Sequence, residues 1–396
     1  MERGPWAIVY LPDAGSHEWA RRPIAGLSVL LRAVMAAVSA GARRVGLPRA
    51  LADDLLLGRI QRHPLLAARV VSLEADPDRT PGAGPFLLLP ANAVVESRSL
   101  RALLQAAERG AAVALEESKG GPSPVLVVSG EQARRLWAPL SAGRPVGEEL
   151  ESWVREGRTT LVPGGGSFVP VTDPSSRRQA EALLYSMLGT EADSVVDRVI
   201  NRRCSRRLTH LLVRLPVSPN QVSFAGLGLG LAGAWAFWFA TPLSALLGLV
   251  LYMLAVVTDH SDGEIARLTF QESVIGRWLD VSVDTVITVL VVMGMAATAT
   301  AVGGPLMLLA GAVAGSGIIV SAVFANFFPP RANRAAGLGR VLRGTGNRDM
   351  LYLVLLFFVL SLWKVQWLLP PLIGLLAVGS HVYWLTCLVQ RKLAAP

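Results

Sequence analysis

Hydrophobic positions follow two different patterns, and the change between them lies near residue 175. Before it, apolar runs are short and are separated by charged residues and prolines. Buried strands are predicted at residues 6–11, 86–89 and 124–128, and amphipathic helices at residues 24–40 and 99–116. Because strands that alternate with helices are typical of a mainly parallel sheet, we expect a soluble α/β domain over residues 1–174.

The second half of the chain contains long stretches without charge. No charged residue occurs over residues 219–258, 285–330 or 350–363. A helix needs about 20 apolar residues to cross a bilayer. The pattern predicts an all-α transmembrane domain over residues 219–396 with six spans, the fifth of them short, at residues 220–240, 243–268, 272–302, 304–328, 349–364 and 366–389.

Residues 175–218 are expected to link the two domains. Within them, residues 197–214 carry six arginines and one acidic residue, Asp197, and leucines supply an apolar face. This combination is typical of a basic helix that lies on a membrane surface.

Composition supports a membrane protein. The 396 residues are 52% apolar and 17% charged, with a mean hydropathy of +0.44 and a net charge of +9. A basic balance can indicate nucleic acid, but in such an apolar chain it favours anionic lipid and cytoplasmic loops. The only two cysteines, Cys204 and Cys387, have no metal-ligand spacing.

Arginine placement predicts the orientation. Basic residues gather at 197–214, 329–348 and 391–392, which fall on one side if there are six spans. By the positive-inside rule this side is the cytoplasm. We therefore expect the basic segments, the α/β domain and both termini on the cytoplasmic side of the membrane.

A dense cluster of charge interrupts the apolar half. It comprises Asp259, Asp262, Glu264, Arg267, Glu272, Arg277, Asp280 and Asp284. Charged residues in spans are costly and usually mark a functional site. A solvated hairpin would explain Glu272 and Arg277, but it explains poorly why Asp280 and Asp284 begin a long apolar run.

The spacing of the aspartates predicts a metal site. Asp259 and Asp262 share one helix face, and Asp280 and Asp284 share another. Two antiparallel helices can therefore bring four carboxylates together, where they repel one another unless cations compensate them. Oxygen ligands of this kind suit Mg²⁺ or Mn²⁺.

The run Asp-x2-Asp-Gly-x2-Ala-Arg-x8-Gly-x3-Asp-x3-Asp, from Asp259 to Asp284, resembles in full the signature of the CDP-alcohol phosphotransferases. Residues 216–223 resemble the segment that leads into the family's first span. The resemblance implies six spans, an active site open to the cytoplasm, a prokaryotic cytoplasmic membrane and often a homodimer. Gly311 and Gly315 are small residues that can serve a helix interface.

The resemblance also implies a reaction, in which an acceptor hydroxyl attacks the β-phosphorus of a CDP-alcohol and CMP leaves. Asp259, Asp262 and Asp280 would bind metal, and Asp284 would both lie near the metal and take the acceptor proton. Two ions are implied. Residues that would surround the CDP group are Asn220, Gly263, Ala266, Arg267 and Gly276. His260, at a position that the signature leaves free, is an additional catalytic candidate.

The acceptor could be a phosphorylated alcohol. Five arginines are numerous enough to bind its phosphate, namely Arg331, Arg334, Arg340, Arg343 and Arg348. Positive-inside topology explains the same residues, and both interpretations stay open.

The first domain resembles a sugar-phosphate nucleotidyltransferase with two departures. Its first loop, residues 11–17, contains one glycine where the family has several, and the strand at 86–90 is followed by Asn92 where the family has a metal-binding aspartate. We expect a degenerate domain, a scaffold or a regulatory module.

The two-domain architecture resembles the bifunctional enzymes that make inositol-phosphate solutes. We expect a transferase that uses a CDP-linked lipid in phospholipid synthesis, with CDP-inositol as the alternative donor. A catalytically silent membrane protein that binds a nucleotide is the alternative from another class. No nucleic-acid partner is expected.

Overall fold

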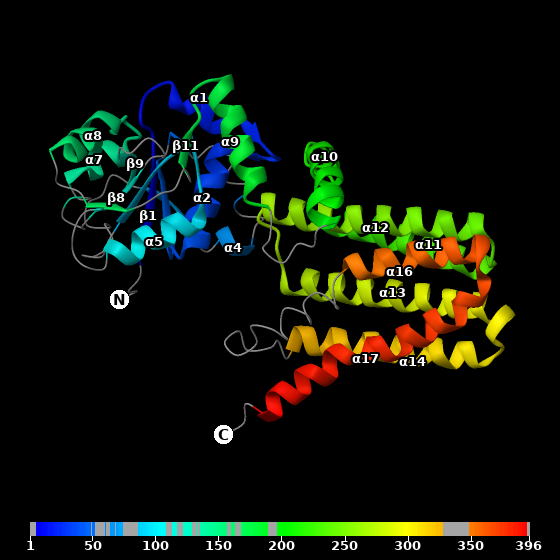
Figure 1. Ribbon diagram of the computed structural model, residues 1–396. Helices are drawn as coiled ribbons and strands as arrows, with labels where there is room; N and C mark the ends of the chain where they lie inside the picture. The colour runs from blue at the N-terminus through cyan, green and yellow to red at the C-terminus, as the bar shows by residue number, and fades with distance from the viewer. Residues whose placement is uncertain are drawn as a thin grey trace. The chain divides into compact units, whose positions relative to one another are not determined.

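The chain folds into two compact units, Met1–Leu188 and Gly189–Pro396, in a computed structural model (Figure 1). The structure describes residues 5–48, 50–51, 60, 64–67, 69–73, 86–107, 113–116, 122–128, 132, 135–156, 160–162, 168–188, 196–327 and 348–393. The boundary between the units lies later than residue 174, because helix α9, Pro174–Ser186, belongs to the first unit.

The first unit contains strands and short helices in alternation. The strands are β1 (Trp6–Tyr10), β2 (Pro23–Ile24), β3 (Leu27–Ser28), β4 (Arg44–Pro48), β5 (Val70–Leu73), β6 (Phe86–Pro90), β7 (Ala93–Val95), β8 (Val113–Glu116), β9 (Pro122–Val128), β10 (Thr160–Val162) and β11 (Phe168–Pro170). The helices are α1 (Ser16–Arg21), α2 (Val29–Ala40), α4 (Pro64–Ala67), α5 (Ser97–Ala107), α7 (Trp137–Ser141), α8 (Gly147–Arg155) and α9.

A seven-stranded sheet in the order β10-β8-β9-β6-β1-β4-β5 forms the centre of this unit (Figure 1). Strand β1 pairs in parallel with β4 and β6, whereas β9 is antiparallel to both of its neighbours. Ile8, Leu88 and Leu126 are fully buried in its core. The predicted α/β class, the three predicted strands and the mainly parallel sheet are confirmed.

Two predicted helices are shorter than expected. The helix predicted at 24–40 begins at Val29, because β2 and β3 form a hairpin whose turn places Ala25 and Gly26 at φ 43° and 85°. The helix predicted at 99–116 ends at Ala107, and residues 113–116 form strand β8. In both cases apolar strand residues adjoin an apolar helix face, so periodicity alone does not separate them.

A buried arginine fixes the β2–β3 hairpin. Arg32 Nε donates to the Ile24 carbonyl at 2.9 Å, and its Nη2 donates to the Ala25 carbonyl. Burial lowers the pKa of the Arg32 guanidinium to about 10, although the charges of Tyr185 and Glu181 act to raise it. The hairpin carbonyls thus receive hydrogen bonds that a turn would otherwise leave to water.

The second unit is a helical bundle. Its elements are η2 (Asp197–Asn201), α10 (Arg202–Leu212), α11 (Pro219–Ala236), η3 (Phe237–Phe239), α12 (Pro242–Leu268), α13 (Val274–Gly303), α14 (Leu306–Phe327), α16 (Arg348–Lys364), η4 (Gln366–Leu368) and α17 (Leu369–Leu393). Helices α11 and α12 both begin with a capping box followed by proline, at Ser218-Pro219 and Thr241-Pro242. These caps set the start of each helix.

Among the described residues, five helices are long and apolar enough to cross a membrane: Pro219–Phe239, Pro242–Leu268, Gly276–Gly303, Leu306–Phe327 and Gln366–Val389. Large apolar side chains on them face outward, including Leu243, which is 77% exposed. The fifth predicted span is the shorter helix α16, with 17 residues. The helical class is confirmed, and the count of six spans stays a prediction.

Exposed aromatic residues lie at both ends of the bundle. Trp235, Trp363 and Trp367 are exposed where α11 ends and α16 meets η4. Trp278 stacks on Phe327 with ring centroids 4.9 Å apart, near the start of α13 and the end of α14. Since successive helices run in opposite directions, these groups form two belts, as at the two interfaces of a bilayer.

Small residues bring the bundle helices together within the chain. A Cβ added at Gly311 of α14 would lie 2.5 Å from the Ala296 Cβ of α13, and one at Gly315 would lie 3.2 Å from Val289 Cγ1. The interface that these two glycines serve is therefore between α14 and α13 of the same molecule.

We expect Gly311→Ala to destabilise the bundle by about 1–3 kcal/mol, because the new methyl group overpacks the contact with Ala296. Gly374→Ala in α17 is the matched control, since a Cβ there meets nothing within 4 Å. Thermal unfolding of both variants in detergent, followed by tryptophan fluorescence, measures the difference. Equal midpoints would contradict this packing.

Candidate active site

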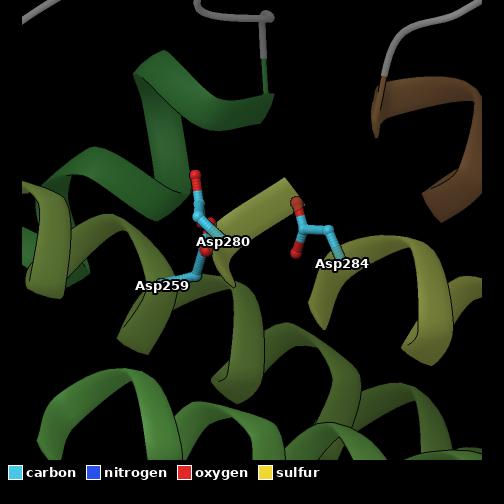
Figure 2. A group of neighbouring side chains, drawn as sticks. All are labelled: Asp259, Asp280 and Asp284. Atoms are coloured by element: carbon cyan, nitrogen blue, oxygen red, sulfur yellow. The ribbon is translucent and has the colours of Figure 1, made fainter. Parts of the chain in front are cut away.

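Three carboxylates meet between α12 and α13. Asp259 lies in the second half of α12, and Asp280 and Asp284 lie one turn apart near the start of α13. One oxygen of each lies within 4.8 Å of the others (Figure 2). Asp259 and Asp284 are half-buried and Asp280 is exposed, so the group is open on one side.

Asp262 is placed differently from the other three. Its Oδ2 accepts a hydrogen bond of 2.5 Å from the Ser223 hydroxyl of α11, and it is not part of the three-carboxylate group. The sequence predicted that four carboxylates converge in one pocket, and all four line it. Three of them lie close enough to share one ion, whereas Asp262 is also bound by a neighbouring helix.

Sequence reasoning assigned no role to Ser223. Its position one turn after Pro219 at the start of α11 was visible, but its contact with Asp262 depends on how α11 and α12 pack. No spacing within one segment reveals that contact.

The pocket lies among three helices, α11, α12 and α13. Its walls combine polar and apolar side chains, contributed by Ser223, Gly226, Leu227, Tyr252, Ala255, Val256, Asp259, Asp262, Asp280, Val283, Asp284 and Ile287. Acidic groups therefore share one cavity with apolar surface, and a ligand there would meet both.

The residues expected to surround a CDP group lie at the ends of these helices. Gly263 lies beneath the Arg267 guanidinium, whose nitrogens are 3.7 Å from the position of an added Cβ. Ala266 is half-buried, and Gly276 donates its N–H to Ser273 Oγ at the start of α13. Asn220 is exposed in the first turn of α11. Their role as CDP ligands stays a prediction.

The proposed acceptor-phosphate residues are mostly beyond the described part of the chain. Arg331, Arg334, Arg340 and Arg343 lie outside the described residues. Arg348 is the first residue of α16.

His260 lies beside the aspartate pocket, and its Nδ1 is 3.8 Å from Asp259 Oδ2. Its side chain is buried, its Nδ1 lies 3.0 Å from the Val256 carbonyl, and its Nε2 lies 3.4 Å from Asp197 Oδ1. It is not among the pocket-lining residues. Its contacts with Val256 and Asp197 are structural, and a catalytic role stays a prediction.

The three-carboxylate group fits a divalent cation by its chemistry. It supplies only oxygen donors, and these lie close enough to share one ion. Mg²⁺ and Mn²⁺ prefer such ligands, and a small number of carboxylates together with a substrate diphosphate is the usual ligand set of Mg²⁺.

Comparison with known proteins agrees with this site. The family model for CDP-alcohol phosphatidyltransferase matches residues 216–388. Residues 216–388 form a CDP-alcohol phosphatidyltransferase domain. The transferase domain includes all four aspartates, four of the helices that are long enough to cross a membrane, and the fifth up to residue 388.

The chain is similar to archaeal and bacterial proteins named "Bifunctional IPC transferase and DIPP synthase". It is 29% identical to that of Archaeoglobus fulgidus over 50% of this chain and 39% of the relative. It is 34% identical to that of Thermococcus kodakarensis over 32% of this chain and 28% of the relative. The matches therefore span well under two thirds of these relatives.

Solved structures with some likeness to the chain are 16–18% identical and cover 46–47% of it. They are Rv0371C of Mycobacterium tuberculosis in complex with manganese, with a TM-score of 0.34, and a Methanothermobacter nucleotidyl transferase, with a TM-score of 0.32. Each is covered over its whole length.

In the first unit, Asn92 and the loop at residues 11–17, the two departures from the nucleotidyltransferase pattern, make contacts within the unit. Asn92 Nδ2 donates to the Val171 carbonyl at 3.2 Å, and the Val171 N–H donates to the Asn92 carbonyl at 2.7 Å. In the first loop, Asp13 Oδ1 accepts the Ser16 N–H at 2.7 Å. Both positions therefore have partners within the unit, and a degenerate domain stays a prediction.

We expect the protein to bind Mn²⁺ and Asp280→Asn to raise the half-saturating concentration by about tenfold or more, because affinity for such ions depends on the charge of the ligands. Glu272→Gln is the matched control, an exposed acid in the turn before α13. Electron paramagnetic resonance of free Mn²⁺ measures binding. An unchanged half-saturation in Asp280→Asn would exclude this aspartate as a ligand.

Proposed function

We propose that the protein is a metal-dependent membrane enzyme that transfers a phosphoalcohol group from a CDP-alcohol to a second alcohol and releases CMP. The main support is that Asp259, Asp280 and Asp284 lie close together between two adjacent apolar helices of a CDP-alcohol phosphatidyltransferase domain. The relatives' names, which also denote transfer enzymes, support the same class of reaction.

The proposed reaction forms one bond to phosphorus, breaks another and transfers one proton. The acceptor oxygen forms a bond to the β-phosphorus while the bond from that phosphorus to the oxygen of the CMP phosphate breaks, and CMP leaves. Bound divalent ions would neutralise the diphosphate charge and align it for in-line attack. Asp284, half-buried beside the other two carboxylates, would accept the proton of the acceptor hydroxyl.

Asp262, the fourth expected metal ligand, differs from the other three in having a side-chain partner on α11. The Ser223 hydroxyl donates to its Oδ2, and both residues line the pocket. Ser223 thereby sets the direction of the carboxylate. Gly263, next to it, leaves room under Arg267 for the cytidine phosphate.

The pocket admits two kinds of donor. Its apolar wall, with Leu227, Val283 and Ile287, suits the acylated part of CDP-diacylglycerol and a role in phospholipid synthesis. CDP-inositol is the alternative, supported by the relatives that carry the double name. Both donors present the same diphosphate to the aspartates.

We propose a cytoplasmic active site. The aspartates lie at the end of the bundle that adjoins α10, whose exposed arginines include Arg203, Arg206 and Arg207. Positive residues concentrate on the cytoplasmic side of membrane proteins.

We expect purified protein in detergent with Mg²⁺ to release CMP from CDP-diacylglycerol or from CDP-inositol, only when an acceptor alcohol is present. Asp284→Asn should lower turnover by about 100-fold or more, because it removes the group that takes the proton. Chromatography of CMP over a panel of acceptors measures the reaction and identifies the donor.

Glu272→Gln serves as the control, because it removes an acidic group from the same hairpin outside the pocket. Folded protein that binds metal but releases no CMP from either donor, with any acceptor of the panel, would refute the proposed reaction and favour a silent nucleotide-binding protein.

A further inference from the structure

A buried carboxylate outside the reaction pocket connects α12 to the helix before the first span. Glu264 has no solvent exposure. It accepts hydrogen bonds from Arg202 Nη1 at 3.0 Å, Ser205 Oγ at 2.9 Å and Thr209 Oγ1 at 2.7 Å. The three donors are spaced i, i+3 and i+7, so they form one face of α10.

A second set of contacts lies one turn earlier. Asp197 Oδ1 lies 3.4 Å from His260 Nε2 and accepts a hydrogen bond of 2.7 Å from Asn201 Nδ2. Asn201 Nδ2 also donates to the Tyr352 hydroxyl of α16 at 2.9 Å. The π-helical turn η2 thus joins α12 and α16 through side chains that are all buried.

The opposite face of α10 is exposed and basic. Arg203, Arg206 and Arg207 are exposed, whereas Arg202, Ser205 and Thr209 are buried. Figure 1 shows α10 lying across the direction of the bundle helices, next to α12. A helix that only rested on the membrane surface would have no buried polar face, because polar groups are costly to bury without partners.

The contacts of η2 and α10 involve residues of α12 that are close in sequence to the aspartates of the site. His260 follows Asp259 directly, and Glu264 lies two residues after Asp262. Displacement of α10 would leave Glu264 charged and buried without its donors, which is strongly unfavourable. The rotation of this part of α12 is therefore coupled to the position of α10.

We propose that η2 and α10, residues 197–212, are a positioning element of the active site, through which Arg202, Ser205 and Thr209 hold Glu264 and so fix the direction of Asp259 and Asp262. This element lies outside the segment that matches the family model. The inference rests on the proposed function, since it concerns the metal site and turnover of that reaction.

Two neighbouring arginines of α10 provide the test. Arg202→Met removes the charged donor to Glu264, and Arg203→Met makes the same change one residue later, on the exposed face. In full-length folded protein, we expect Arg202→Met to raise the half-saturating Mn²⁺ concentration and to lower kcat for CMP release by about tenfold each, as loss of a group that orients metal ligands does. Arg203→Met should stay within about twofold of the parent protein.

Two further variants separate positioning from loss of folding. Thr209→Val removes one neutral donor with little change in shape, and it should shift the Mn²⁺ half-saturation in the same direction as Arg202→Met. In the double variant with Arg202→Met and Glu264→Gln, no carboxylate is left buried without its charged donor, and part of the metal affinity should return. A defect in folding alone would lower the yield of folded protein and leave its half-saturation unchanged.

The outcomes distinguish the two proposals. Unchanged Mn²⁺ half-saturation and kcat in folded Arg202→Met and Thr209→Val, or equal effects of Arg202→Met and Arg203→Met, would overturn the positioning role. Absence of both Mn²⁺ binding and CMP release in the parent protein would instead refute the proposed function.

Discussion

The cost of placing carboxylates among apolar helices governs the second unit. Every buried or half-buried acid near the end of α12 must have a compensating partner, and each finds it on a different element. Asp259 meets Asp280 and Asp284 of α13, where a cation is the suitable partner. Asp262 takes the Ser223 hydroxyl of α11, and Glu264 takes three donors from α10. The requirement for partners thus specifies how four helices pack.

Patterns within one segment were sufficient to predict most elements and the aspartate cluster. Strands β1, β6 and β9 lie where buried apolar runs predicted them, and the i, i+4 spacing of Asp280 and Asp284 places both on one face. Tertiary register was not accessible in this way. The contact of Ser223 with Asp262 joins residues 39 apart, and that of Asn201 with Tyr352 joins residues 151 apart.

Tertiary contacts add detail to two interpretations made from the sequence. Gly311 and Gly315 were expected to serve a helix interface, and their lack of a side chain lets α14 approach α13 of the same chain. His260 stands between two motif aspartates in the sequence, yet successive residues of a helix point about 100° apart. Its ring therefore lies between Asp197, 3.4 Å from Nε2, and Asp259, 3.8 Å from Nδ1, and does not line the pocket.

The same helix geometry explains how α12 contributes both to the aspartate pocket and to the contacts with η2 and α10. Asp259 and Asp262 are three residues apart and face α13 and α11, whereas His260 and Glu264 are four apart and face η2 and α10. Ser261, between the two faces, donates to the Ser205 carbonyl of α10 at 3.3 Å. A signature written for the reacting face omits His260 and Glu264, since their partners lie on a segment before the matched residues. The pocket and the contact with α10 therefore use adjacent faces of the same turns of α12, which is why the proposed positioning role of α10 acts through this helix.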